Sequence, residues 1–306
     1  MEHSQISNKE HQVAVVMVPL WEQGHLNQLL HLSRLVSAHK IPVYYIATAT
    51  HNRQARTRAH GFDPSSLTNL HFHDFPTPSF PNLSPNPNSS NKFPSHLFPM
   101  IKASMNLREP IFNLVKELSD TVGRVVVIYD SLMAYVVQDM KSLANVESYC
   151  FHSISAFTLF SFYWENAGKP IVPTEVEVVL RELPSMEGCL TQEFLEFSEM
   201  QREVRKSHHG NLFNSNREIE SLYLDMLEKL AFLGGEKHFA IGPFNPVEKK
   251  DPKSRIERVV RKLMESGEGD ETRQRAKELA RGVAQSVMEG GPTRLEMDLF
   301  IAHITR

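Results

Sequence analysis

An apolar run from Val13 to Leu20 that gives way to Gln23-Gly24-His25 constrains the fold of this chain more than any other feature. Within this run, Val13 to Val18 has the composition of a buried parallel strand, and the leucines after His25 recur at helical spacing. A second apolar run, from Ile41 to Ala49, follows as another strand. These segments form a right-handed crossover unit, which consists of a strand, a loop that holds His25, a helix and a second strand. We therefore expect His25 at the carboxyl edge of a parallel sheet, where open α/β sheets bind ligands.

Later segments continue this alternation and predict an α/β fold with a doubly wound parallel sheet, followed by C-terminal helices. Strands are predicted at Leu70 to Phe75, Val125 to Tyr129 (ending on Asp130), Ser148 to His152, Asn211 to Asn214 and His238 to Ile241. Helices are predicted at Ile101 to Leu118, Leu132 to Leu143, Ala156 to Trp164 (capped by Ser153), Gln192 to Lys206 and Glu218 to Leu230.

Two regions depart from this alternation. Residues 76–99 hold seven prolines, so they cannot form a regular element, and such a loop is either functional or disordered. Beyond residue 250 the sequence predicts helices at 255–265 and 271–289, separated by a break at Gly267 and Gly269 and ended by Gly290-Gly291-Pro292. A last helix, at 295–304, has an apolar side that we expect to pack on the first domain: Leu295, Leu299, Ala302 and, as an open assignment, Ile301.

Composition excludes several functional classes. A net charge of −3 without long blocks of one sign gives no electrostatic basis for binding nucleic acid or an anionic membrane. Cys150 and Cys189 are too few for a disulfide framework, which suits the cytoplasm. The start of the sequence lacks the features of a signal peptide. The most apolar later stretch, from Ile154 to Trp164, is shorter than the ~20 residues of a membrane-spanning helix.

Three short motifs carry a resemblance to a known family: Gln23-Gly24-His25, Tyr129-Asp130-Ser131 and Ile241-Gly242-Pro243. With them the chain resembles the plant UDP-dependent glycosyltransferases, and among these the zeatin O-glucosyltransferases. The resemblance implies the GT-B architecture, in which a first Rossmann-like domain binds the acceptor and a second binds the UDP-sugar. Residues 1–248 would be the acceptor-binding domain, and residues 249–306 a remnant of the closing helices.

The sequence is truncated relative to the family's plan. The family's donor signature, a tryptophan-rich block ending in His-Cys-Gly-Trp-Asn-Ser, does not occur, and neither G-x-G-x-x-G nor G-x-x-x-x-G-K replaces it. UDP-glucose is the donor that the resemblance implies, but these 306 residues offer no pocket that we expect to hold it. No other cofactor is expected. His71 and His73, which share one face of a predicted strand, lack the cysteine or carboxylate partners that a metal site requires.

The resemblance assigns roles to residues at the expected carboxyl edge. His25 would be the general base that takes the proton of an acceptor hydroxyl, and Asp130 would orient and stabilise its imidazole. Asp130 could equally cap the helix that follows it, and the two roles are compatible. The family mechanism inverts the anomeric carbon in one displacement. The residues that we expect to bind substrate are Trp21, Gln23, Gly24, His152, Ser153 and Phe157.

The loop before His25 departs from the family pattern. Relatives usually carry small residues or proline where this chain has Trp21-Glu22. We expect Trp21 to add an apolar side chain at the mouth of the site and Glu22 to repel the phosphates of a nucleotide.

Three interpretations are compatible with the sequence. The first is an O-glucosyltransferase that acts on a small hydroxylated acceptor such as a cytokinin. The second is an acceptor-binding or regulatory module without catalysis, which sequesters a ligand or pairs with an intact relative. Self-association through the exposed interdomain face is a separate expectation. The third is the product of an incomplete gene model.

Overall fold

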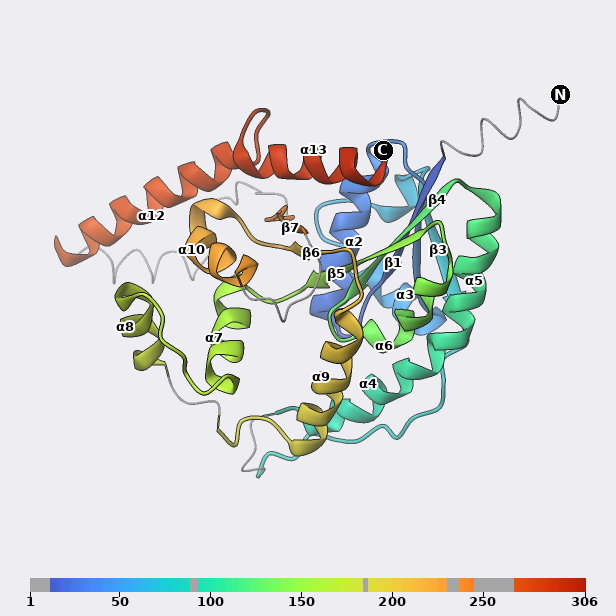
Figure 1. Ribbon diagram of the computed structural model, residues 1–306, viewed down its shortest axis with the longest axis horizontal. Helices are drawn as coiled ribbons and strands as arrows, with labels where there is room; N and C mark the ends of the chain where they lie inside the picture. Colours follow the sequence, from blue (N-terminus) through green and yellow to red (C-terminus); the bar gives the residue numbers. More distant parts are fainter. Residues whose placement is uncertain (1–11, 89–92, 184–186, 230–236, 245–266) are drawn as a thin grey trace.

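The computed structural model of the protein describes residues 12–88, 93–183, 187–229, 237–244 and 267–306, with side chains from residue 273 onward in the last range. The predicted α/β fold is confirmed: the described residues form a seven-stranded sheet with helices on both faces (Figure 1). None of the described helices combines the length and the apolar character that spanning a membrane would require.

All strand pairs in this sheet are parallel, and the strand order is β3-β2-β1-β4-β5-β6-β7. Strands β2 and β3 are therefore added on one side of β1, and strands β4 to β7 are added on its other side. Open sheets bind ligands where the order reverses, outside the carboxyl ends of the two central strands. The strands are β1 (Val13–Val18), β2 (Val43–Thr48), β3 (Leu70–Phe75), β4 (Arg124–Asp130), β5 (Val146–His152), β6 (Gly210–Phe213) and β7 (Lys237–Ala240).

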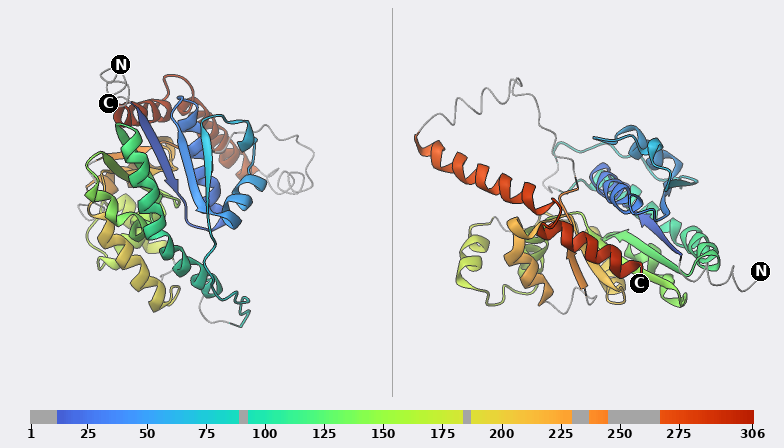
Figure 2. Two further views of the ribbon diagram at one scale, coloured as in Figure 1. Left: turned by 90° about the vertical axis from the view of Figure 1, so that its right-hand side faces the viewer. Right: turned by 90° about the horizontal axis from the view of Figure 1, so that it is seen from above.

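The helices pack in two layers around this sheet (Figures 1 and 2). One apolar core lies beneath α2, α3 and α13, a second beneath α4, α5, α6 and α9, and a third joins α7, α8 and α10 to β6 and β7. The helices are α2 (Gln23–Ser37), α3 (Ala49–Thr57), α4 (Phe98–Ser104), α5 (Arg108–Thr121), α6 (Ala134–Val137), α7 (Ala156–Asn166), α8 (Thr174–Glu182), α9 (Gln192–Arg205), α10 (Arg217–Glu228), α12 (Gly267–Ser286) and α13 (Pro292–Ile304).

Short 3₁₀ turns replace parts of two predicted helices. The helix expected at Ile101 to Leu118 is divided into α4, a 3₁₀ turn (Met105–Leu107) and α5, with Pro110 in the first turn of α5, where its missing N–H costs nothing. The helix expected at Leu132 to Leu143 is only α6 followed by a 3₁₀ segment (Gln138–Ser142). Two more such turns, Pro64–Ser66 and Ser95–Leu97, lie in loops.

Helix starts were the least accurate part of the sequence prediction. His25 does not lie in a loop, because α2 begins at Gln23 and places His25 in its first turn. Ser155, not Ser153, caps α7 by accepting a hydrogen bond from the backbone N–H of Thr158. Helix α8 was not predicted. The expected glycine break was also wrong, since α12 begins at Gly267, and the helix predicted at 255–265 lies outside the described residues.

Helix α13 packs on the sheet as predicted, but with a different face. Leu295 and Leu299 are 51% and 63% exposed, and Ala302 is exposed as well. Phe300 is completely buried, with its ring 5.6 Å from that of Tyr149 and 5.2 Å from that of Phe239. The helix carries two apolar stripes, and the one that fills the space above β5 and β7 is packed inward: Met297, Phe300, Ile301 and Ile304.

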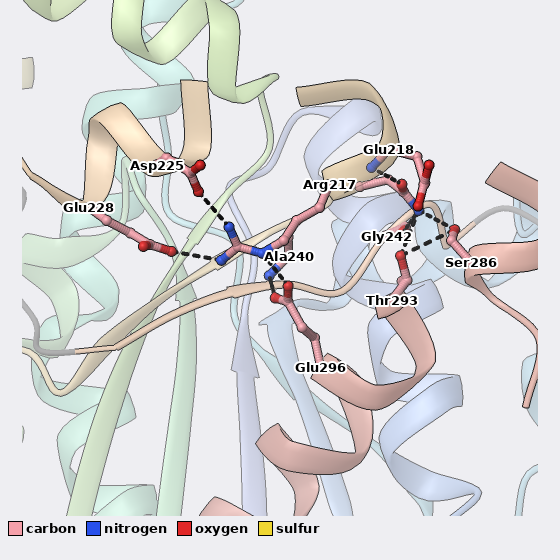
Figure 3. Close-up of polar contacts among 10 residues, drawn as sticks. Arg217, Glu218, Asp225, Glu228, Ala240, Gly242, Ser286, Thr293 and Glu296 are labelled. Atoms are coloured by element: carbon pink, nitrogen blue, oxygen red, sulfur yellow. Dashed lines mark hydrogen bonds and ion pairs between the residues drawn. The ribbon is translucent and has the colours of Figure 1, made fainter. Parts of the chain in front are cut away.

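Polar contacts also hold α12 and α13 in place (Figure 3). Asn216, the buried N-cap of α10, donates its amide hydrogens to Ser286 and to the Thr293 hydroxyl, the latter at 2.6 Å. The guanidinium of Arg217 contacts the carboxylates of Asp225, Glu228 and Glu296. Glu296 accepts, in addition, a hydrogen bond from the backbone N–H of Ala240 in β7. These contacts tie Ser286, Thr293 and Glu296 to α10 and β7.

We expect Phe300→Ala to lower the free energy of unfolding by about 3–5 kcal/mol, because the substitution leaves a cavity between α13 and the sheet. Leu299→Ala, at the exposed neighbouring position, should change it by less than about 0.5 kcal/mol. Urea denaturation of the two variants and the wild type measures both values. Equal effects of the two substitutions would show that α13 does not pack as described.

Candidate active site

The reversal of strand order between β1 and β4 brings His25 and Asp130 together. His25 follows β1 in the first turn of α2, and Asp130 is the last residue of β4. Nδ1 of His25 lies 2.7 Å from Oδ2 of Asp130, so the expected hydrogen-bonding distance is confirmed. The Asp130 side chain is completely buried, whereas that of His25 is 23% exposed. The imidazole is therefore supported from inside the protein and accessible from outside.

Both carboxylate oxygens of Asp130 have partners. While Oδ2 faces His25, Oδ1 accepts a hydrogen bond from the backbone N–H of Leu132 at 3.0 Å. The aspartate thus holds the turn after β4 while it faces the imidazole, but it does not cap the following helix, because the N-cap of α6 is Met133. A carboxylate on Nδ1 selects the tautomer with the hydrogen on that nitrogen, which leaves the lone pair on Nε2 to accept a proton.

The charges around His25 favour its protonated form. Burial lowers the pKa of His25, but the charge and hydrogen bond of Asp130 and the charge of Glu22 together outweigh it, so this pKa lies above its ordinary value. Burial also raises the pKa of the Glu22 carboxyl, whose Oε1 has no hydrogen-bond partner among the described residues.

A chain of hydrogen bonds supports the histidine from behind. The Ser153 hydroxyl lies 2.9 Å from Nδ1 of His25, and the Ser153 carbonyl accepts from Nε2 of Gln28 at 2.9 Å. Gln28 accepts in turn from the amide of Asn214 at 2.9 Å, and Asn214 accepts from the backbone N–H of Phe244 at 3.2 Å. These contacts tie α2 to the ends of β5 and β6 and to the segment after β7.

Sequence reasoning missed Gln28 and Asn214. Gln28 lies three residues after His25, on the same face of α2, which is a signal that could have identified it. Asn214 gave no such signal, because its position follows only from the parallel pairing of β6 with β5.

The three predicted residues next to His25 have different surroundings. Trp21 does not lie at the mouth of the site: it is 2% exposed in the second core, and its ring stacks on that of His51 with the centroids 4.6 Å apart. Gln23 hydrogen-bonds Asn27 at 2.9 Å and accepts from Arg58 at 3.2 Å. Gly24 is exposed, and a Cβ at this position would meet no atom within 4 Å. The backbone beside His25 is therefore open to an approaching molecule.

The three predicted residues after β5 also differ from one another. Ser153 joins the site through its contact with His25. His152 is buried, with Nε2 2.8 Å from the Asn211 side chain, and burial lowers its pKa to about 3, so it is neutral and held within the sheet. Phe157 is partly buried in the third core, with its ring 4.9 Å from that of Tyr223. Of the three, the structure brings only Ser153 into contact with the histidine–aspartate pair. No cluster of three potential metal ligands occurs among the described residues.

Comparison with solved structures identifies this architecture. The fold is similar to that of Arabidopsis thaliana UGT89C1 complexed with UDP-L-rhamnose, with a TM-score of 0.55, 15% identity and coverage of 84% of this chain and 54% of the other. It is also similar to Glycyrrhiza uralensis UGT73P12, with a TM-score of 0.53, 19% identity and coverage of 76% and 49%. At these identities the likeness establishes the fold alone.

Sequence comparison establishes the family. Residues 11–246 match the model of the glycosyltransferase N-terminal domain. The chain is 49% identical over 244 residues to zeatin O-glucosyltransferase of Phaseolus lunatus, covering 79% of this chain and 51% of that protein. It is 44% identical over 246 residues to zeatin O-xylosyltransferase of Phaseolus vulgaris, covering 80% and 52%. The chain thus spans about half the length of these curated relatives. The chain belongs to the UDP-dependent glycosyltransferase family, as a member matching its N-terminal domain.

Proposed function

We propose that this chain binds a small hydroxylated acceptor and activates its hydroxyl group for glycosyl transfer, with His25 as the general base. The observation that carries the proposal is the 2.7 Å contact between Nδ1 of the partly exposed His25 and the fully buried carboxylate of Asp130. An alcohol is a poor nucleophile at neutral pH, and an imidazole supported in this way is suited to remove its proton.

The transfer itself needs no nucleophile from the protein. As the acceptor oxygen forms a bond to the anomeric carbon of a UDP-sugar, its proton passes to Nε2 of His25. The bond between that carbon and the UDP oxygen breaks at the same time, and UDP leaves with the electron pair. Asp130 stabilises the imidazolium that results, and Ser153 and Gln28 keep the ring oriented.

The relatives point to the class of acceptor. Two of the most similar are named for transfer of glucose and of xylose to zeatin, and two from Zea mays are named for cis-zeatin. We therefore propose zeatin or a similar hydroxylated cytokinin as the acceptor, with UDP-glucose as the donor in the complete reaction.

Acceptor binding without transfer is the second candidate function, and the absence of a phosphate-binding motif from the 306-residue sequence favours it. General-base assistance contributes about 10² to 10⁴ in rate, whereas positioning two reactants contributes about 7–11 kcal/mol. An intact His25 cannot replace the larger contribution when the UDP-sugar is not held.

Asp130→Asn should lower the pKa of His25 below its ordinary value, because burial then becomes the dominant influence on the imidazole. Glu22→Gln should lower it by less. In the wild type the raised pKa contributes folding stability that is fully present below pH ~6.5 and is lost as the pH rises through the folded-state pKa. NMR titration of the imidazole, assigned with His25→Ala, measures these values; an unchanged pKa in Asp130→Asn would contradict the pairing.

The chain alone should bind zeatin but show no detectable glucosyl transfer. Calorimetry with trans- and cis-zeatin, and separately with UDP-glucose, measures binding, and chromatography of the O-glucoside measures transfer. Zeatin binding without UDP-glucose binding is the expected result. Product above that of a His25→Ala control would show that the chain is a complete transferase, and absence of zeatin binding would refute the proposed acceptor.

The base role can be tested in a chimaera in which residues 11–246 replace the matching half of the Phaseolus lunatus relative. We expect glucosyl transfer to zeatin, and a fall of kcat by about 10²-fold or more on His25→Ala, the size of general-base assistance. The parent enzyme is the positive control. A His25→Ala chimaera with activity within tenfold of the unsubstituted chimaera would exclude His25 as the base.

A further inference from the structure

Arg205 is a buried cation without an anionic partner among the described residues. It is the last residue of α9 and is 7% exposed. Its guanidinium donates to the carbonyl of Ser131 at 2.6 Å and to the hydroxyl of Tyr163 at 3.2 Å. Burial lowers its pKa, but Cys150 and the nearby tyrosines raise it, and the net shift is upward, so the group stays charged.

The neighbouring arginine has a different environment. Arg202, three residues earlier on α9, contacts the carboxylates of Glu199 and Glu203. Among the described residues the Arg205 guanidinium, which has five N–H donors, donates to two neutral oxygens, and a buried charge is costly unless its hydrogens are satisfied. Atoms that can accept hydrogen bonds are therefore favoured beside it.

Arg205 lines a cavity of about 730 Å³ between α7 and α9, two helices that face each other in Figure 1. This volume lies within the range of small-molecule sites, ~300–1,000 Å³. The cavity is related to the active site through the sheet edge, because Ser131, which accepts from Arg205, directly follows Asp130. The cavity and the histidine–aspartate pair thus belong to the same carboxyl edge.

The walls of the cavity favour a neutral ligand that can accept hydrogen bonds. Phe162, Ala167 and Leu195 give it apolar walls, and the exposed carboxylate of Glu196 also lines it. Because Glu196 and Glu199 balance the charges of Arg202 and Arg205, the cavity lining gives no net attraction for an anion, while a purely apolar ligand would offer Arg205 no acceptor. A flat, neutral ring with lone pairs on ring nitrogens satisfies both conditions.

We propose that the cavity between α7 and α9 binds a neutral nitrogen-containing aromatic ring, and that Arg205 determines this specificity by donating hydrogen bonds to ring nitrogens. The inference rests on the proposed function and extends it, since the ring would be that of the acceptor. Zeatin consists of an adenine ring with a hydroxylated side chain. Arg205 would then recognise the ring and His25 the hydroxyl, so the two contributions are separable.

Calorimetry on the 306-residue chain can measure the contributions of Arg205 and His25 separately. The two ligands are trans-zeatin and N6-isopentenyladenine, which has the same ring but lacks the hydroxyl. We expect Arg205→Met to weaken binding of both ligands at least tenfold, and Arg205→Lys, which keeps the charge, to weaken them less. His25→Ala should weaken zeatin alone. Arg181→Met, which removes an exposed arginine paired with Glu177 on α8, serves as the control and should change neither affinity by more than twofold.

A second measurement does not depend on the folding of any variant. Deaza analogues of N6-isopentenyladenine, each with one ring nitrogen replaced by C–H, are titrated into the wild-type chain, and we expect at least one to bind tenfold more weakly. Equal affinity for all of them, or an unaltered affinity in a folded Arg205→Met variant, would overturn the inference while leaving His25-dependent zeatin binding intact. If the wild-type chain binds neither trans-zeatin nor N6-isopentenyladenine, the proposal that Arg205 recognises the ring is wrong. The proposal that His25 is the general base is then still tested by glucosyl transfer in the chimaera.

Discussion

The parallel pairing of β1 with β4 is the constraint on which the rest of the structure depends. It places Val18 beside Tyr129, at the ends of two strands that the sequence separates by more than a hundred residues. Side chains alternate between the faces of a strand, so a slip of one residue in this register would turn Asp130 away from His25. The buried carboxylate, the accessible imidazole and the turn held by Asp130 all follow from that register.

Much of the fold could be predicted because strands appear in the sequence either as continuous apolar runs, such as Val13 to Val18, or as apolar residues that alternate with polar ones, such as Leu70 to Phe75. The segments Val13 to Val18 and Leu70 to Phe75 are strands with those bounds, and the meeting of His25 with Asp130 follows from the rule that carboxyl ends share one edge. The inward face of α13 could not be predicted. Leu299 and Phe300 are both apolar, and only the space left above Tyr149 decides which of them is buried.

The polar details of the site depend on contacts between distant segments. Ser153 and Ser155 are equally good capping residues by type, and the backbone geometry at the start of α7 selects Ser155, leaving Ser153 beside His25. Gln28 and Asn214 become partners only after three strands have paired. Sequence patterns therefore locate the chemistry of this site, whereas the groups that orient it emerge from tertiary structure.

The packing of α13 has a consequence for synthesis of the protein. The helix lies about 50 residues beyond β7 in the chain, yet its Phe300 fills the core between Tyr149 and Phe239. While the ribosome is still making the intervening residues, the sheet can pair but one of its apolar faces has no cover. The nascent domain therefore passes through a stage in which chaperone binding or aggregation competes with completion of its core.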